Sequence, residues 1–250
     1  MADRAKILVL GATSAIAEQW ARLRAEQGDS LLLVARDAEK LEAIRRDLEA
    51  RGASSVEIAV EDLGETENAS KRFDKFIDTM DGIDVTFIAY GILGGQDLAE
   101  TDPAHLERIL TINFSSAVLW AELTARAFQL QGQGTLIGIS SVAGDRGRKT
   151  NYAYGAAKAG FSTYLAGMAH RFAGSDVHVL TVKPGFVDTP MTAHIENREG
   201  PLWATPEAVA KAIERAVRKR KTTVYTPWFW RFIMLIIIHL PRFVFNRMKI

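Results

Sequence analysis

Short apolar runs alternate with longer segments of helical spacing along almost the whole chain. The apolar runs predict strands at Ile7–Leu10, Leu31–Ala35, Val56–Val60, Val85–Ala89, Leu136–Ile139, Val177–Val182 and Thr222–Tyr225. The intervening segments predict helices at Ala15–Gln27, Lys40–Arg51, about 66–80, from the Thr101-Asp102-Pro103 cap, at about Tyr152–Arg171 and from the Thr205-Pro206-Glu207 cap. Strands separated by helices imply right-handed parallel crossovers. We therefore predict an α/β, Rossmann-like, doubly wound and mostly parallel sheet of about seven strands with helices on both faces.

Composition limits the classes of protein that this chain can be. The 250 residues carry a net charge of +1, which gives no indication of a nucleic-acid partner. The absence of cysteine excludes disulfides and thiolate chemistry, and we predict no metal site. The charged start runs into a short apolar stretch without an export signal, so we expect a cytoplasmic protein. Residues 1–226 are predicted to form a dinucleotide-binding and catalytic domain, with the apolar and basic segment 227–250 packed on it.

The first predicted strand leads into LGATSAIA, residues 10–17, before a helix. A dinucleotide-binding loop would read more like TGASSGIG, and of its three glycines only Gly11 is present. Gly11 allows a sharp turn, and the following helix N-terminus offers free N–H groups to a pyrophosphate. Ala17 stands where alanine is tolerated, whereas Ala15 is a stronger departure. On its own, the loop fits a phosphate-binding loop and a plain strand–helix turn about equally.

A second stretch, SSVAGDRGRKTNYAYGAAKAG at residues 140–160, carries groups suited to proton transfer. Tyr154 and Lys158 are four residues apart on a predicted helix, so their side chains share one face. A neighbouring ammonium would favour the phenolate and lower the tyrosine pKa. Ser141, at the end of the preceding strand, could hydrogen-bond a carbonyl oxygen beside them. The alternative is an incidental pair on a solvated helix face.

The order and spacing of Gly11, Asn113, Ser141, Tyr154 and Lys158 resemble the short-chain dehydrogenase/reductase family over nearly the whole chain. The resemblance implies an NAD(P)-dependent oxidoreductase acting on CH–OH and C=O groups. Tyr154 would exchange the proton on the substrate oxygen, and Ser141 would orient that oxygen. Lys158 would lower the tyrosine pKa and bind the nicotinamide ribose, and Asn113 would hold a water that links Lys158 to solvent.

The same resemblance implies a set of cofactor contacts, including Pro184-Gly185 at the nicotinamide carboxamide and Asp62 at the adenine. The residue sequence IAYG, 88–91, departs from the family's NNAG. Arg36, after the second strand, suits a 2′-phosphate, so NADP(H) is favoured over NAD(H). We expect Ala15 and Ala17 to pack at the helix start. The predicted contacts are Gly11, Thr13, Ser14, Ile16, Arg36, Asp62, Leu63, Ala89, Gly91, Tyr154, Lys158, Pro184, Gly185, Val187 and Thr189.

Three features bear on the substrate. Arg146, Arg148 and Lys149 lie between Ser141 and Tyr154, where they would meet an anionic group or form a solvated basic loop. His194 and Trp203 lie in the segment that covers substrate in the family, or pack on the core. The longest uninterrupted apolar stretch of segment 227–250 is shorter than the roughly 20 residues that a membrane-spanning helix needs. Its aromatic and basic residues fit an interfacial membrane contact or, equally, a subunit interface or sheet-edge cover; they are Trp228, Trp230, Arg231, Arg242, Arg247 and Lys249.

Within the family, AYGILGG, the basic loop and the tail most resemble one branch. That branch is the reductase partner in decaprenylphosphoryl-ribose 2′-epimerisation, which reduces a 2-keto pentofuranose carried on a polyprenyl phosphate. The resemblance implies a lipid-linked substrate, a partner oxidase and a location at the inner face of the membrane. The branch is NADH-linked, which conflicts with Arg36. The alternatives are a reductase of soluble ketones or 3-oxoacyl thioesters, whose tail builds a homodimer or homotetramer, and an inactive nucleotide-sensing or scaffold protein.

Overall fold

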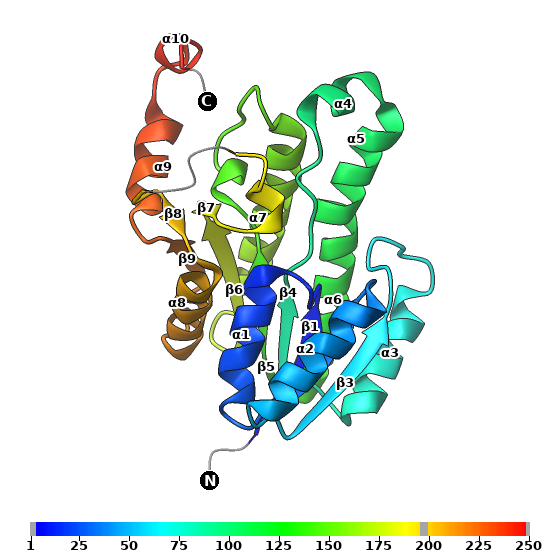
Figure 1. Cartoon of the computed structure of the whole chain (residues 1–250). Helices are drawn as coiled ribbons and strands as arrows, with labels where there is room; N and C mark the ends of the chain where they lie inside the picture. The colour runs from blue at the N-terminus through cyan, green and yellow to red at the C-terminus, as the bar shows by residue number, and fades with distance from the viewer. Residues whose placement is uncertain (1–3, 196–199, 249–250) are drawn as a thin grey trace.

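The computed structural model describes residues 4–195 and 200–248. Within them, parallel strands form a seven-stranded sheet in the order β3-β2-β1-β4-β5-β6-β9, which confirms the predicted fold class (Figure 1). The strands are β1 (Lys6–Leu10), β2 (Ser30–Ala35), β3 (Ser55–Val60), β4 (Val85–Ile88), β5 (Gln133–Ile139), β6 (Asp176–Pro184) and β9 (Thr223–Thr226). The strand order reverses between β1 and β4, so the carboxyl ends of these two strands mark a crevice where doubly wound folds bind nucleotides.

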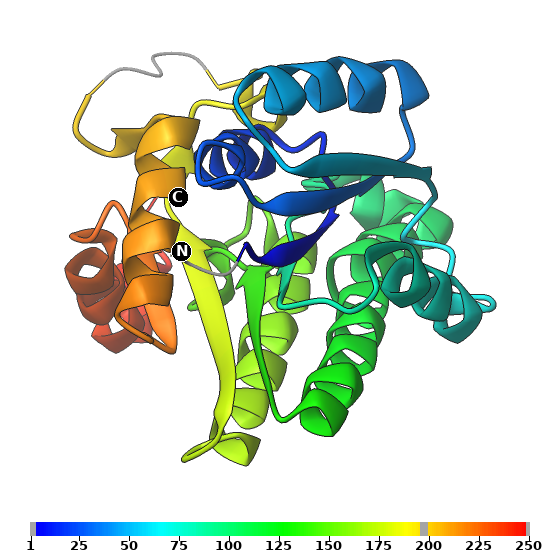
Figure 2. The same cartoon turned by 90° about the horizontal axis from the view of Figure 1, so that it is seen from below.

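Helices cover both faces of the sheet (Figure 2). One layer consists of α1 (Ala15–Ala25), α2 (Ala38–Ala50) and α8 (Pro206–Arg218), and the other of α3 (Ala69–Met80), α6 (Ser116–Gln131) and α7 (Tyr152–Arg171). Alternate residues of β1 enter two separate cores: Ile7 and Val9 pack with the first layer, and Leu8 and Leu10 with the second. Because both faces are buried, the strand reads as a continuous apolar run.

The boundaries of several elements differ from the predicted ones for local reasons. Helix α2 begins at Ala38, since the Asp37 side chain accepts a hydrogen bond from the Lys40 amide (3.0 Å). The helix predicted from about residue 66 begins at Ala69. The long helix predicted after Pro103 is divided into α5 (Pro103–Leu110), a π-helical turn (Thr111–Ser115) and α6. A short helix that was not predicted, α4 (Gln96–Thr101), precedes α5.

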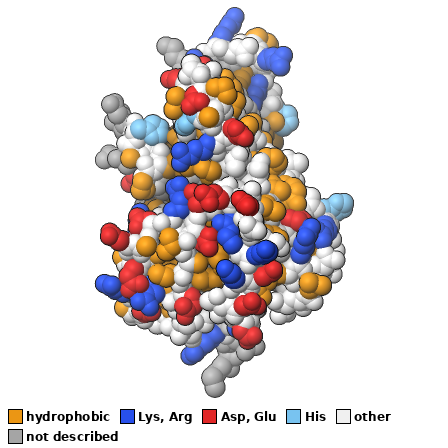
Figure 3. Space-filling model, turned by 90° about the vertical axis from the view of Figure 1, so that its right-hand side faces the viewer, with side chains coloured by type: hydrophobic (Ala, Val, Ile, Leu, Met, Phe, Trp, Pro, Cys, Tyr) orange, Lys and Arg blue, Asp and Glu red, His pale blue; other side chains and the backbone are white. Residues whose placement is uncertain are grey.

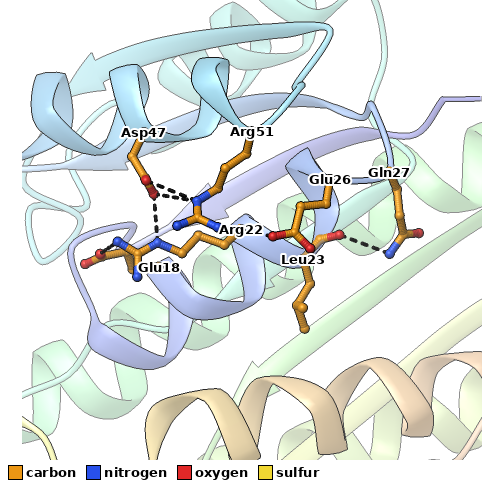
Figure 4. Close-up of polar contacts among 7 residues, drawn as sticks. All are labelled: Glu18, Arg22, Leu23, Glu26, Gln27, Asp47 and Arg51. Atoms are coloured by element: carbon orange, nitrogen blue, oxygen red, sulfur yellow. Dashed lines mark hydrogen bonds and ion pairs between the residues drawn. The ribbon is translucent and has the colours of Figure 1, made fainter.

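Ion pairs join α1 to α2, the helices that begin beside the ends of β1 and β2 (Figure 4). Arg22 lies between Glu18 (2.8 Å) and Asp47 (2.7 Å), and Arg51 lies 3.0 Å from Asp47 and 3.1 Å from Glu26. Such partly exposed pairs contribute little individually, but as a network they hold the two helices in one relative position.

The C-terminal segment packs beside β9, near the carboxyl ends of the strands (Figure 1). It contains α9 (Trp230–His239) and α10 (Arg242–Phe245). A small parallel pair, β7 (Phe186–Val187) and β8 (Trp203–Ala204), lies next to it. Among the described residues, none of the helices combines the length and apolar character needed to cross a bilayer. Acidic and basic side chains intermix over the lower part of the face shown in Figure 3.

Candidate functional site

One large cavity of about 1250 Å³ lies at the carboxyl ends of the strands. Every residue predicted to contact cofactor lines it, together with Ser141. Asn113 is the one predicted site residue outside the lining. The predicted residues found in the lining are Gly11, Thr13, Ser14, Ile16, Arg36, Asp62, Leu63, Ala89, Gly91, Ser141, Tyr154, Lys158, Pro184, Gly185, Val187 and Thr189.

The remaining glycine of the first loop is required by two independent constraints. Gly11 has φ of +89°, a conformation that favours glycine. In addition, a Cβ at this position would lie 2.6 Å from the Tyr90 Cβ, because the two chain segments cross in close contact. The Gly11 amide donates to the Val34 carbonyl (2.8 Å), which fixes the turn against β2. The loop can therefore lose its other glycines but not this one.

The two alanines of this loop differ in their surroundings. Ala17 is fully buried in the core, as expected. Ala15 begins α1, as expected, but it is only partly buried and lines the cavity. In the described part of the chain, the amides of Ala15 and Ile16 have no hydrogen-bond partner, whereas the Ser14 amide donates to Gly11 (3.0 Å). Free amides at a helix start fit the pyrophosphate of a dinucleotide.

Tyr154 and Lys158 lie side by side on α7, and both side chains are nearly buried. The Lys158 Nζ lies 5.8 Å from the centre of the Tyr154 ring and donates to the Ile139 carbonyl (2.9 Å). Burial raises the pKa of Tyr154 to about 12, although a hydrogen bond with Ser141 lowers it. Burial also lowers the pKa of Lys158 to about 8. The expected lowering of the tyrosine pKa by Lys158 is thus wrong for the protein alone, because burial raises the pKa of Tyr154 and the group that lowers it is Ser141.

Asn113 connects the site to the loop after β4. It lies fully buried in the π-helical turn, donates to the carbonyls of Ile92 (2.8 Å) and Ile109 (2.9 Å), and accepts from the Ile92 amide (3.1 Å). A Cβ on Gly91 would lie 2.6 Å from the Asn113 Oδ1 and 3.4 Å from the Lys158 Nζ. One amide hydrogen of Asn113 and its Oδ1 therefore hold the loop at Ile92, while the other amide hydrogen bonds α5 at Ile109. Gly91 leaves the space in which Asn113 and Lys158 approach the loop.

Tyr90 accounts for the departure from NNAG. Its ring packs against the core under α6, and its hydroxyl lies 3.0 Å from the Ser116 Oγ. Burial raises the pKa of the Tyr90 phenol. The Tyr90 side chain therefore supports the loop from the side of α6. Ala89 and Gly91, which line the cavity, are small residues that leave its volume open.

The end of the cavity beside β2 and β3, where the adenosine of a cofactor is expected, carries two cations. Arg36 is exposed and lies 3.6 Å from the Asp62 carboxylate, a loose pair. Lys40, in the first turn of α2, also lines the cavity, as does Glu61. Lys40 was missed by the sequence reasoning, although its position four residues after Arg36 was a usable signal.

Helix α9 forms a wall of the opposite end of the cavity. Trp230 lies so close to Gly185 that a Cβ there would be 2.0 Å from its Nε1, which donates to the Leu202 carbonyl (3.2 Å). Its ring meets Phe186 edge-on, with centroids 5.5 Å apart. Trp230, Ile233 and Ile237 all line the cavity. Of the alternatives for this segment, the membrane contact is wrong for Trp230, because its ring is buried in the protein.

The basic loop divides into three different environments. The Arg146 guanidinium donates through Nη1 to the carbonyls of Ile237 and Leu240 (2.9 Å for the latter) at the C-terminal end of α9. This side chain is partly buried and is not in the cavity lining, so it is not placed to bind substrate. Arg148 lines the cavity, and Lys149 is exposed. Only the position of Arg148 is compatible with the predicted anion contact.

The two residues predicted to cover substrate, His194 and Trp203, also differ in their surroundings. His194 lines the cavity, whereas Trp203 stacks on Phe186 with ring centroids 5.1 Å apart and is not in the lining. Trp203, in β8, therefore packs against β7, and it neither lines the cavity nor belongs to a buried core cluster among the described residues. Lys249 lies outside the described residues.

Comparison with known proteins gives one consistent result. A sequence model described as short chain dehydrogenase matches residues 5–200. An uncharacterized oxidoreductase of Mycobacterium tuberculosis is 36% identical over 244 residues, covering 98% of this chain and 97% of the relative. An uncharacterized oxidoreductase of Streptomyces coelicolor is 34% identical over 245 residues, covering 98% and 96%.

Solved structures agree on the fold. A short-chain dehydrogenase from Sphingobium yanoikuyae in complex with NADPH superposes with a TM-score of 0.81 at 21% identity, covering 95% of this chain and 97% of that one. An actinorhodin polyketide ketoreductase variant with NADPH gives a TM-score of 0.76 at 22% identity, covering 85% and 90%. At these identities, the likeness concerns the fold alone.

Proposed function

This chain belongs to the short-chain dehydrogenase family and is an NAD(P)-dependent oxidoreductase, and on that premise we propose that it reduces the carbonyl group of a hydrophobic, lipid-linked substrate with NADP(H). The observation that carries the proposal is the lining of the large cavity. Its floor holds Ser141, Tyr154 and Lys158, and its far wall is the apolar inner side of α9.

The proposed chemistry divides between cofactor and protein. A nicotinamide bound in the cavity would supply a hydride to the carbonyl carbon. Tyr154 donates its hydroxyl proton to the carbonyl oxygen, and Ser141 hydrogen-bonds that oxygen as negative charge develops on it. Lys158, held by the Ile139 carbonyl, restores the proton to Tyr154 and binds the nicotinamide ribose. Asn113 fixes the Gly91 loop against Lys158 and is proposed to hold the water through which protons return.

The preference for NADP(H) rests on charge at the adenosine end. Arg36 and Lys40 both line the cavity there, and a 2′-phosphate would accept hydrogen bonds from both. Arg36 has only a loose pair with Asp62, so it is free to turn toward such a group. NAD(H) is the alternative, favoured by the nearby carboxylate of Glu61, which could accept a bond from a ribose hydroxyl.

Fluorescence titration tests this preference. The wild type is expected to bind NADPH about tenfold more tightly than NADH, given charge-assisted hydrogen bonds to one phosphate. Arg36→Ala with Lys40→Ala should weaken NADPH binding by a similar factor and leave NADH binding unchanged. Tighter binding of NADH by the wild type would contradict the proposal.

The proposal of a lipid-linked substrate rests on the different surroundings of the two sides of α9. Its inner side chains line the cavity, while its outer side and α10 expose large apolar side chains beside cations. We propose that this outer surface lies on the inner face of a membrane, so that a polyprenyl-phosphate-linked pentose enters along α9 with its 2-keto group toward Tyr154. The exposed side chains are Trp228, Phe232, Leu235, Ile236, Phe243, Arg231, Arg242 and Arg247.

Flotation with vesicles tests the membrane contact. The wild type should float with phosphatidylglycerol vesicles and much less with phosphatidylcholine, since cations favour anionic lipid. Trp228→Ser with Phe232→Ser should abolish flotation without changing NADPH binding, because both side chains point away from the cavity lining. If the wild type does not float but elutes as a dimer or tetramer that these changes dissociate, the outer surface is a subunit interface.

Turnover separates the substrate classes. NADPH oxidation with a farnesylphosphoryl 2-keto pentofuranose, with any oxidase partner omitted, should exceed oxidation with a 3-oxoacyl thioester or a small soluble ketone. Equal or greater turnover of the soluble compounds would favour the reductase of soluble substrates. Cofactor binding without oxidation in any of the three assays would favour the nucleotide-sensing alternative.

A further inference from the structure

Arg148 is the one cavity-lining cation beside the candidate catalytic residues that has no anionic partner in the described chain. It lies between Ser141 and Tyr154 in the sequence and is partly buried. Its Nε is inaccessible to solvent and has no hydrogen-bond partner among the described residues, and its Nη2 donates only to the thioether of Met234 (3.5 Å). A thioether is a weak acceptor, so most of the donor capacity of this guanidinium is unused.

Two other partly buried arginines, Arg24 and Arg72, are each paired with a carboxylate. Arg24 lies 2.7 Å from a carboxylate oxygen of Asp29, and Arg72 lies 3.1 Å from one of Glu61. Keeping a guanidinium away from water without an anion costs free energy, which is why such groups are normally paired. An unpaired guanidinium that faces a cavity is therefore a candidate ligand-binding group.

The nearest acidic residue is already engaged. Asp145 has one carboxylate oxygen 2.5 Å from the Lys183 Nζ, and the other accepts from the Tyr225 hydroxyl (2.9 Å). These bonds hold the loop to β6 and β9. Burial lowers the pKa of Arg148, and Asp145 raises it only in part.

The wall around Arg148 is apolar. Met234 is fully buried and packs with Val142 and Trp230, and Ile233 and Ile237 line the cavity from the same helix. A ligand that fits this end of the cavity would carry an anionic group next to an apolar chain. Arg146 cannot serve, because its guanidinium is bound to the end of α9.

We propose that Arg148 binds an anionic group of the substrate, a phosphate ester, and thereby sets the preference of the enzyme for ketones that carry such a group beside an apolar chain. The inference rests on the proposed carbonyl reduction for its turnover assay but not for its binding assay. The guanidinium offers several donors to the phosphate oxygens, while the chain lies along α9.

Binding is measured first, without turnover. Octyl phosphate is titrated calorimetrically into the full-length protein saturated with NADPH, so that the cofactor phosphate sites are filled, and octanol serves as the neutral ligand. Arg148→Met keeps the length and the packing on Met234. It should weaken octyl phosphate binding about tenfold or more, as expected for loss of a charge-assisted contact, and leave octanol binding unchanged. Lys149→Met removes an exposed charge from the same loop and should change neither.

Turnover is then compared for 5-oxohexyl phosphate and 6-hydroxyhexan-2-one, which differ only in the phosphate group. The wild type should prefer the phosphate, and Arg148→Met should lose that preference through KM rather than kcat. Arg148→Lys should retain part of it. The melting temperature of Arg148→Met should not fall, since an unpaired charge is removed.

The outcomes separate the two proposals. If Arg148→Met binds octyl phosphate as the wild type does, or loses activity equally with both ketones, Arg148 is a structural residue and the inference fails. If octyl phosphate binds through Arg148 but neither ketone is reduced, the anion site stands and the proposed reduction of carbonyls fails.

Discussion

Replacing Lys158 by methionine should change how the stability of the protein depends on pH. The Lys158 side chain is nearly fully buried, and burial lowers its pKa from 10.5 to about 8. Between pH 8 and pH 10.5 the unfolded chain binds a proton at this residue that the folded chain has released. The unfolding free energy of the wild type therefore rises with pH across this window.

The magnitude follows from the two pKa values. At pH 7 both states are mostly protonated, and the folded state bears nearly the whole cost of the buried charge. Most of that cost has disappeared by pH 9.5. The calculated gain from pH 7 to pH 9.5 is about 2 kcal/mol in unfolding free energy, and Lys158→Met should lack it. The lost bond to the Ile139 carbonyl shifts the stability of the variant by an amount that does not depend on pH.

Urea denaturation of both proteins at several pH values between 7 and 9.5 measures the effect. The difference in unfolding free energy, wild type minus variant, should increase by about 2 kcal/mol across the range. Tyr154 has little influence here, since its pKa of about 12 lies above the window. Lys149→Met, at an exposed position, should show a constant difference. A constant difference for Lys158→Met as well would refute the assigned cost of burying this ammonium.

Two further predictions concern the loop and the tail. Gly11→Ala should lower the unfolding free energy by more than Gly28→Ala in urea denaturation: both have positive φ, which costs about 1–2 kcal/mol for alanine, but only the first adds a Cβ 2.6 Å from the Tyr90 Cβ. Equal losses would show that the contact with Tyr90 relaxes freely. Arg146→Met should free the end of α9 and speed chymotryptic cleavage of the tail in limited proteolysis. The control variant Lys149→Met should be cleaved at the wild-type rate. Unaltered cleavage of Arg146→Met would mean that its bonds to the helix end do not hold the tail.

The fold was predictable because its signals are local. The buried strand β1 appears in the sequence as an apolar run because both faces are covered, and Asp102-Pro103 begins a helix through a side-chain cap on the Ala104 amide (2.9 Å). Tyr154 and Lys158 were placed together by helical spacing alone. The π-helical turn around Asn113 was not predictable, since no residue type in Thr111–Ser115 specifies it.

The substrate end of the site was harder to predict because its contacts are distant in sequence. Arg146 meets carbonyls that lie 91 and 94 residues away, and Trp230 is buried by contact with Gly185. A residue pattern that looks solvated or interfacial cannot reveal such a partner. The raised pKa of Tyr154 was missed for a related reason, since spacing reports the neighbouring lysine but not the burial of both groups.

The role of Tyr154 tests the account most directly. Tyr154→Phe removes the hydroxyl and keeps the buried ring, so NADPH should bind with an unchanged Kd in a fluorescence titration. NADPH oxidation with 5-oxohexyl phosphate should fall by about 1000-fold or more, within the range expected for loss of a proton donor in the transition state. A Tyr154→Phe protein that oxidises NADPH at the wild-type rate would contradict the proposed carbonyl reduction at this site.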